Sequence, residues 1–127
     1  MTMTARKTPY VLDRAPVFSW YRDHNGLIYT SGHAAVDVDS LHIDRGDLVS
    51  ETRATLNNLR RTLEAAGSSL EKVLKVTVYL TDMGQYNAFN AVYATYFPGS
   101  RPPARTCVEV SRLPFNFKVE IEVIAAT

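Results

Sequence analysis

Residues 102–126 read PPARTCVEVSRLPFNFKVEIEVIAA and carry the most regular pattern in this chain of 127 residues. Apolar and polar residues alternate over 105–111 and again over 118–126. A period of two is typical of β-strands, in which successive side chains point to opposite faces of a sheet. We therefore expect the chain to end in two strands.

A third strand and a hairpin are predicted upstream of this stretch. Residues 72–81, KVLKVTVYLT, alternate in the same way. Residues 17–31, VFSWYRDHNGLIYTS, contain two β-branched and aromatic runs on either side of Asn25-Gly26. An Asn-Gly pair readily adopts the positive φ angles of a tight turn, so we expect two antiparallel strands here. Residues 33–46 lack periodicity and are expected to form a loop.

Two helices are predicted between these strands. The first covers 48–67, begins after the N-cap residue Asp47 and ends at Gly67. Its apolar residues recur at steps of three and four, at Leu56, Leu59, Leu63 and Ala66. The second follows a capping-box pattern, Asp82 with Gln85, and ends at Pro98-Gly99. One side of it carries Tyr86, Phe89, Asn90, Tyr93 and Phe97.

The element order is therefore β-β-α-β-α-β-β, which favours a two-layer α+β domain with both helices on one face of a mixed sheet. We interpret residues 1–127 as a single domain whose polar residues 1–9 are loosely held. The uncovered face would present either Arg105 and Cys107 or Glu120, Glu122 and Ile124. Since that face is partly apolar, we expect the chain to associate with itself.

Composition excludes several classes of function. Fourteen Lys and Arg against thirteen Asp and Glu give a net charge of +1, which offers no field for a polyanion, so nucleic acid is not expected as the main partner. No apolar run is long enough for a membrane helix, and the N-terminus lacks a secretory signal. The three histidines and the single cysteine show no metal-ligand spacing. We expect a cytoplasmic protein that needs no metal and no cofactor.

Three residues of the terminal strands could carry chemistry. Arg105 follows Pro102-Pro103-Ala104, so a rigid, extended chain would hold its guanidinium ready for a carboxylate. Glu120 shares a face with Glu122, and a sheltered carboxylate there could orient water. Cys107 shares a face with Arg105, whose charge would lower the pKa of the thiol. The alternatives are an arginine in an ordinary ion pair, a solvated strand face and a small buried residue.

Two further positions are candidates for contact with a ligand. Ser31-Gly32 ends the predicted hairpin, and a glycine lets a ligand approach the backbone. Asn90 lies among aromatic residues on the second helix, where a buried amide needs partners. A plain turn and a loop-capping amide are the alternatives.

Taken together, these segments resemble a known family. Residues 102–126 closely resemble the C-terminal signature of the RidA/YjgF enamine/imine deaminases, roughly P-x-R-x-x-V-x-V-x-x-L-P, a short loop and V-E-I-E-x-I-A. Residues 27–37, LIYTSGHAAVD, resemble its apolar strand ending in Ser-Gly, and residues 51–97 resemble its two helices and central strand. The resemblance covers residues 15–126.

The resemblance implies a fold and an assembly. The fold is the chorismate-mutase-like α+β fold, with a six-stranded mixed sheet and two helices on one face. The assembly is a homotrimer with ligand pockets in the clefts between subunits, which would cover the open face of the sheet.

The resemblance also implies roles for particular residues. Arg105 aligns with the arginine that binds the carboxylate of a 2-imino acid, and Glu120 aligns with the glutamate proposed to activate water. The backbone carbonyl of Cys107 is implied to accept a hydrogen bond from the substrate nitrogen. The remaining pocket positions are Ser31, Gly32, Asn90 and Phe18.

Phe18 is a departure from the family, because many deaminating members have a tyrosine there. Trp20 and the Phe115-Asn116-Phe117 loop are expected to add apolar surface to the rim of the pocket.

The leading hypothesis for function is therefore hydrolysis of 2-imino acids to 2-oxo acids and ammonia, as in 2-iminobutanoate/2-iminopropanoate deaminases. The first alternative is a catabolic C–N hydrolase that acts on a larger unsaturated amino or imino acid. The second alternative is a non-catalytic trimer that binds a small carboxylate.

Overall fold

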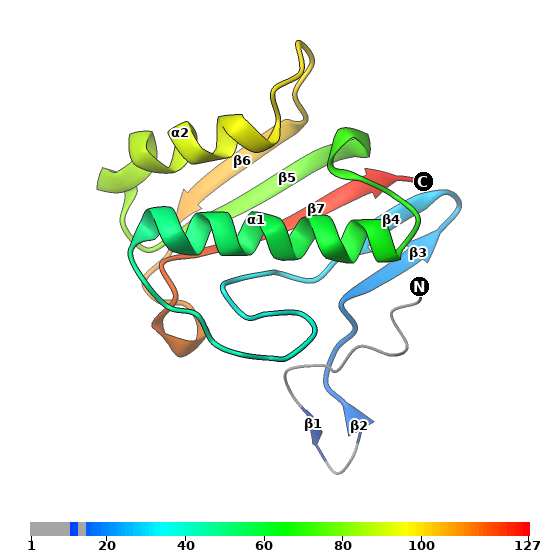
Figure 1. Ribbon diagram of the computed structural model, residues 1–127, viewed down its shortest axis with the longest axis horizontal. Helices are drawn as coiled ribbons and strands as arrows, with labels where there is room; N and C mark the ends of the chain where they lie inside the picture. Colours follow the sequence, from blue (N-terminus) through cyan, green and yellow to red (C-terminus); the bar gives the residue numbers. More distant parts are fainter. Residues whose placement is uncertain (1–10, 13–14) are drawn as a thin grey trace.

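The computed structural model describes residues 11–12 and 15–127. The expectation of a loose segment over residues 1–9 falls outside them. Two helices, α1 (Leu48–Ala65) and α2 (Tyr86–Tyr96), lie side by side across one face of a β-sheet (Figure 1). The predicted two-layer α+β architecture is confirmed.

The main sheet has five strands in the order β3-β4-β7-β5-β6. They are β3 (Tyr21–His24), β4 (Leu27–Thr30), β5 (Val73–Leu80), β6 (Ala104–Glu109) and β7 (Val119–Ala126). All neighbours are antiparallel except β5 and β6, which are parallel because α2 carries the chain back across the sheet between them.

The sheet differs in one respect from the expectation. The family resemblance implies six strands, whereas five lie in the main sheet of the described chain, and these are the five that the alternation predicts. The additional strands, β1 (Val11–Leu12) and β2 (Ala15–Pro16), pair only with each other. Pro16 has no backbone N–H to donate, so it cannot extend this pairing into a longer ladder.

Local signals in the sequence explain the turns and the helix ends. Asn25 and Gly26 have φ angles of 51° and 79°, which form the hairpin turn between β3 and β4. Asp47 caps α1, where its side chain accepts from the N–H of Ser50 at 2.8 Å. Asp82 is an N-cap as expected, but it caps a short 3-10 turn, η3 (Met83–Gln85), that precedes α2, and its side chain accepts from the N–H of Gly84.

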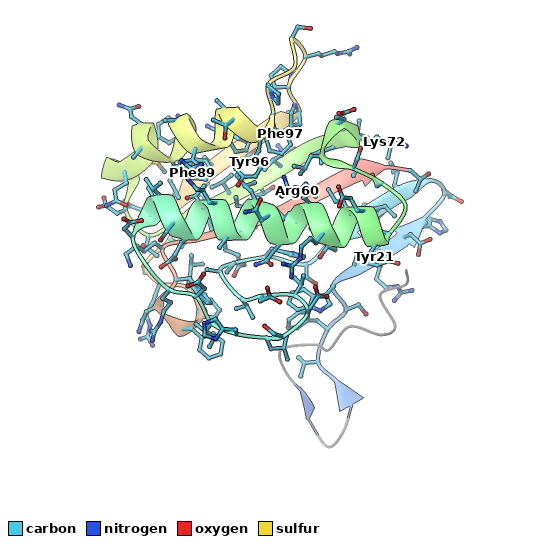
Figure 2. All side chains as sticks on the ribbon, in the orientation of Figure 1. Tyr21, Arg60, Lys72, Phe89, Tyr96 and Phe97 are labelled. Atoms are coloured by element: carbon cyan, nitrogen blue, oxygen red, sulfur yellow. The ribbon has the colours of Figure 1, made fainter. Side chains whose placement is uncertain are left out.

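The core lies between the helices and the sheet. Alternate residues of β5 and β7 are fully buried there, and leucines of α1 and Phe89 of α2 pack against them. On the opposite face of β7 lie Glu120, Glu122 and Ile124, all half-buried. Tyr96 of α2 joins the two helices, since its hydroxyl donates to Asn57 Oδ1 of α1 at 3.1 Å (Figure 2).

Candidate functional site

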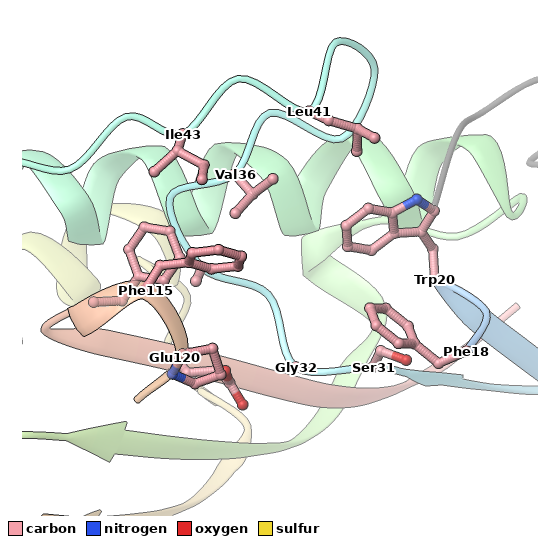
Figure 3. A pocket seen from close by; sticks show the side chains of 12 residues that line it. Phe18, Trp20, Ser31, Gly32, Val36, Leu41, Ile43, Phe115 and Glu120 are labelled. Carbon is pink, nitrogen blue, oxygen red and sulfur yellow. The ribbon is translucent and has the colours of Figure 1, made fainter. Parts of the chain in front are cut away.

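A cavity of about 350 Å³ opens beside the start of β7 (Figure 3). Phe18 and Trp20 form one side of it, and Val36, Ile43 and Phe115 form the other. The full lining consists of Phe18, Trp20, Ser31, Gly32, Ala34, Val36, Leu41, Ile43, Pro114, Phe115, Phe117 and Glu120. Four of the predicted site residues, Phe18, Ser31, Gly32 and Glu120, therefore meet in one cavity. Trp20, Phe115 and Phe117 add apolar surface to it, as expected.

Ser31 and Gly32 lie where the chain leaves its pairing with β7. The ladder between β4 and β7 stops after Tyr29 and resumes only at the bridge between His33 and Ile121. Ser31 is fixed by two bonds to the preceding strand region, since its N–H donates to the carbonyl of Trp20 and its hydroxyl to that of Ser19. This irregularity makes room for the side chain of Glu120.

Glu120 points into the cavity with its carboxyl group against Gly32. A Cβ built on Gly32 would lie 2.8 Å from Glu120 Cδ and 3.0 Å from Cγ, so a larger residue would displace the carboxyl group. Burial raises the pKa of Glu120, and the nearby charge of Glu122 raises it further. Among residues 11–12 and 15–127, no cation forms an ion pair with it. Such a carboxylate is a competent general base.

Arg105 lies on the other face of the sheet, under α2. Its guanidinium donates through Nη1 to Asn90 Oδ1 and through Nη2 to the hydroxyl of Tyr86, both at 2.8 Å. Three aromatic rings surround it, with its Cζ 5.5 Å from the centroid of Tyr86, 5.7 Å from that of Phe89 and 4.8 Å from that of Tyr93. The cage fixes the guanidinium of Arg105, and the N–H groups that do not donate to Asn90 or Tyr86 can bind an anion.

Cys107 lies two residues along the same face of β6 and is partly buried against the core. Burial raises the pKa of its thiol more than the charge of Arg105 lowers it. The expectation of a lowered thiol pKa is therefore wrong, because desolvation of the thiolate outweighs the attraction of the cation.

The described chain thus presents two separate half-sites. The register pairs Arg105 with Val76 and Glu120 with Tyr79, which lie on opposite faces of β5. The sequence left open whether Arg105 and Cys107 or Glu120 and Glu122 face away from the helices. In the structure the two glutamates face away from them. Arg105 and Glu120 of one chain cannot act on the same small molecule.

The comparisons with known proteins agree with this fold. The family model described as endoribonuclease L-PSP matches residues 12–127. The chain belongs to this family, also called RidA/YjgF.

Relatives of this RidA/YjgF chain include proteins with assigned and unassigned activities. A RutC family protein of Pyrococcus horikoshii is 48% identical over 99 residues, 78% of each chain. The 2-iminobutanoate/2-iminopropanoate deaminase of Mus musculus is 43% identical over 98 residues, 77% of this chain and 72% of the relative.

Solved structures of the family superpose closely on the chain. A protein of Thermotoga maritima described as a putative endoribonuclease has a TM-score of 0.83 at 34% identity, covering 96% of this chain and 95% of that one. E. coli TdcF with bound serine has a TM-score of 0.81 at 31% identity, covering 96% and 97%.

Sequence reasoning missed three residues that hold the half-sites in place. His33 is buried beside Trp20, donates through Nδ1 to the carbonyl of Ser31 and shares a hydrogen bond at Nε2 with the hydroxyl of Thr62, both at 2.8 Å. Buried Glu51 accepts from the N–H groups of Gly46 and Lys118. The third is Tyr86, described above. The contacts of His33 with Thr62, of Glu51 with Lys118 and of Tyr86 with Arg105 join residues far apart in sequence, so no local pattern indicates them.

Residues 11–12 and 15–127 contain neither a metal site nor a membrane-spanning helix. No group of three or more His, Cys, Asp or Glu side chains is arranged to hold a metal ion. In the same part of the chain, neither helix has the length and apolar character to cross a membrane.

Proposed function

We propose that this protein hydrolyses 2-imino acids to 2-oxo acids and ammonia, in a site that two neighbouring copies of a homotrimer build together. The observation that carries the proposal is the half-buried carboxyl group of Glu120, whose raised pKa suits it to take a proton from water. The deaminase activity that names the Mus musculus relative supports the reaction class. The serine bound to TdcF supports a small carboxylate as ligand.

Arg105 binds the substrate in this proposal. Two parallel N–H groups of a guanidinium match the two oxygens of a carboxylate. Asn90 and the aromatic cage prevent the guanidinium from rotating, so the imine carbon is held in one orientation. Burial raises the pKa of Tyr93 to about 12, so its ring stays neutral beside the cation.

Glu120 performs the proton transfers. Its carboxylate takes a proton from water while the water oxygen bonds to the imine carbon, and it passes that proton to the imine nitrogen, which gives a carbinolamine and leaves Glu120 ionised again. The hydroxyl of that intermediate then returns a proton through Glu120 to the nitrogen, the C–N bond breaks, and ammonia leaves with a 2-oxo acid. One water is consumed and no electrons are exchanged. A positioned general base supplies about 10²–10⁴-fold in rate.

Assembly reconciles this chemistry with the two half-sites. A rotational, head-to-tail interface brings different surfaces of neighbouring subunits together. It can therefore set the Arg105 face of one subunit against the Glu120 face of the next. The half-buried Ile124 and Glu122 of the open sheet face would be covered at the same time. The lone cysteine fits a reducing compartment, so we propose the cytoplasm as the location.

The test mixes two inactive variants. An amino-acid oxidase generates 2-imino acids, and semicarbazide competes for them, so suppression of semicarbazone reports hydrolysis. Arg105→Ala and Glu120→Gln are each expected to lose turnover. Refolded together in equal amounts, they should recover about a quarter of the wild-type activity, because random mixing restores one intact pair in four.

The outcomes separate the competing functions. Recovery on mixing supports a shared site, whereas no recovery, or a light-scattering mass of one chain, contradicts it. Full turnover by Glu120→Gln contradicts its role as base. If the wild type binds a 2-oxo acid but hydrolyses no imine, the protein is a carboxylate-binding trimer instead.

A further inference from the structure

We propose that the cavity beside Glu120 selects carboxylates with a large apolar side chain, such as the imines of phenylalanine and leucine, and that Phe115 sets this preference. The reaction assumed for these imines rests on the proposed function. The selectivity itself rests on the size and lining of the cavity, so the two can be tested separately.

The size of the cavity exceeds the needs of a small imine. A water molecule occupies about 30 Å³ of liquid. A cavity of about 350 Å³ thus holds about a dozen non-hydrogen atoms. Without the carboxylate, which the proposed function places on Arg105 of the neighbouring copy, the imine of alanine has about three non-hydrogen atoms and that of phenylalanine about nine, so only the larger one comes close to filling the cavity. A ligand that fills the cavity displaces its water and buries more apolar surface.

The lining favours hydrocarbon over polar groups. Nine of the twelve lining residues are apolar, and the other three, Ser31, Gly32 and Glu120, lie together at one end (Figure 3). The polar end suits the reacting imine carbon. At the opposite end, a substrate side chain would contact only Trp20, Leu41 and their apolar neighbours. Phe18 lies beside Ser31 and adds no hydroxyl to the lining (Figure 3), so a polar substrate side chain would lose its hydrogen bonds to water among the apolar residues.

Phe115 and Ile43 leave apolar surface exposed at the mouth of this cavity. The exposed fractions of their side chains are 43% and 39%. Exposed apolar surface around a concave site is typical of ligand grooves. An apolar side chain that entered between the two residues would remove this surface from water.

The backbone at the mouth is held in an unfavourable conformation. Phe115 has a φ of 56° and Leu41 a φ of 63°, a region that large side chains rarely adopt. Both residues line the cavity. Strained positions of this kind cluster at ligand clamps. Arg45 Nη1 donates to the carbonyl of Phe115 at 3.1 Å and thereby ties the turn to the loop across the mouth.

Phe115→Gly is the most informative variant. Glycine accepts a positive φ readily, so the substitution removes the ring and leaves the turn unstrained. Leu74→Ala is the matched control, because Leu74 is 52% exposed on β5 and does not line the cavity. Thermal melts verify that both variants fold.

The experiment has two readouts. The first compares kcat/KM for the imines of alanine, leucine and phenylalanine. The second measures binding of pyruvate and of 4-methyl-2-oxopentanoate through the fluorescence of Trp20, the chain's single tryptophan and a lining residue. We expect the larger ligands to be favoured about 10-fold or more in both readouts. Phe115→Gly should reduce this ratio about 10-fold, and Leu74→Ala should keep it.

Each outcome decides between the two proposals. Equal use of small and large imines overturns the selectivity and keeps the proposed hydrolysis. Preferential binding of the larger oxo acid without turnover of any imine keeps the selectivity and overturns the hydrolysis. No preference in either readout, or a preference that survives in Phe115→Gly, overturns the role assigned to Phe115 and its cavity.

Discussion

Glu120 and Gly32 are in such close contact that the carboxyl group occupies the space a side chain at position 32 would need. A Cβ on Gly32 would come within 3.0 Å of three atoms of the Glu120 side chain. Gly32 itself has no positive φ, so its role is to make room rather than to relax the backbone. The sequence signal for this contact is the Ser31-Gly32 pair.

Gly32→Ala should therefore lower turnover while the fold is kept. The added methyl group moves the end of a flexible side chain and leaves the backbone in place, so we expect kcat to fall about 10-fold or more with little change in Tm. Ala34→Gly, at a neighbouring lining residue whose change adds no methyl group, is the control and should keep kcat near that of the wild type. An unchanged kcat in Gly32→Ala would contradict the contact as a requirement for turnover.

Tyr86→Phe tests the cage around Arg105. The hydroxyl accepts from Nη2 at 2.8 Å, and the substitution removes that bond but retains the ring. We expect KM for an imino acid to rise about 10-fold, because a charged hydrogen bond contributes about 1.5–3 kcal/mol. We expect kcat to change less than threefold. A fall in kcat at constant KM would contradict a positioning role.

Much of this architecture was predictable from local pattern. Alternation located the strands, Asn25-Gly26 located the hairpin turn, and Asp47 marked the start of α1 within one residue. Each of these signals acts between residues close in sequence, where propensity and turn chemistry decide the outcome. The sixth strand of the main sheet, which only the family resemblance implied, is not found among residues 11–12 and 15–127.

The candidate site was predictable only in part. The alternation along each strand placed Arg105 on the same face as Cys107, and Glu120 on the same face as Glu122. It did not predict which of the two pairs faces the helices. That depends on how α2 crosses the sheet and on the register of β6 with β5, which are tertiary properties. The sign of the pKa shift of Cys107 failed for a related reason, since burial is invisible in the local sequence.

Asp37 should make stability depend on pH in the acidic range. The N–H of Ser40 and then other donors, including Arg61, lower its pKa from 3.8 to about 2. A lowered pKa in the folded state gives stability that is present above pH ~4 and is lost as the pH falls toward ~2.

Asp37→Ala should therefore cost about 1 kcal/mol of unfolding free energy at pH 7, a value reduced for the exposure of the side chain. The difference from the wild type should shrink between pH ~4 and pH ~2 in urea titrations. Asp23→Ala, at an exposed aspartate of β3, is the control. A difference that stays constant with pH would exclude the charge of Asp37 as its origin.

Glu122 should control the pH at which hydrolysis begins. Its charge raises the pKa of Glu120 in addition to burial, and only ionised Glu120 can accept a proton. The rate should therefore rise with pH through the pKa of Glu120. Glu122→Gln removes the charge and still accepts from Tyr79, so this rise should move to lower pH. Glu71→Gln, on an exposed turn, should leave the profile of kcat against pH unchanged. A shift to higher pH would contradict the assigned roles.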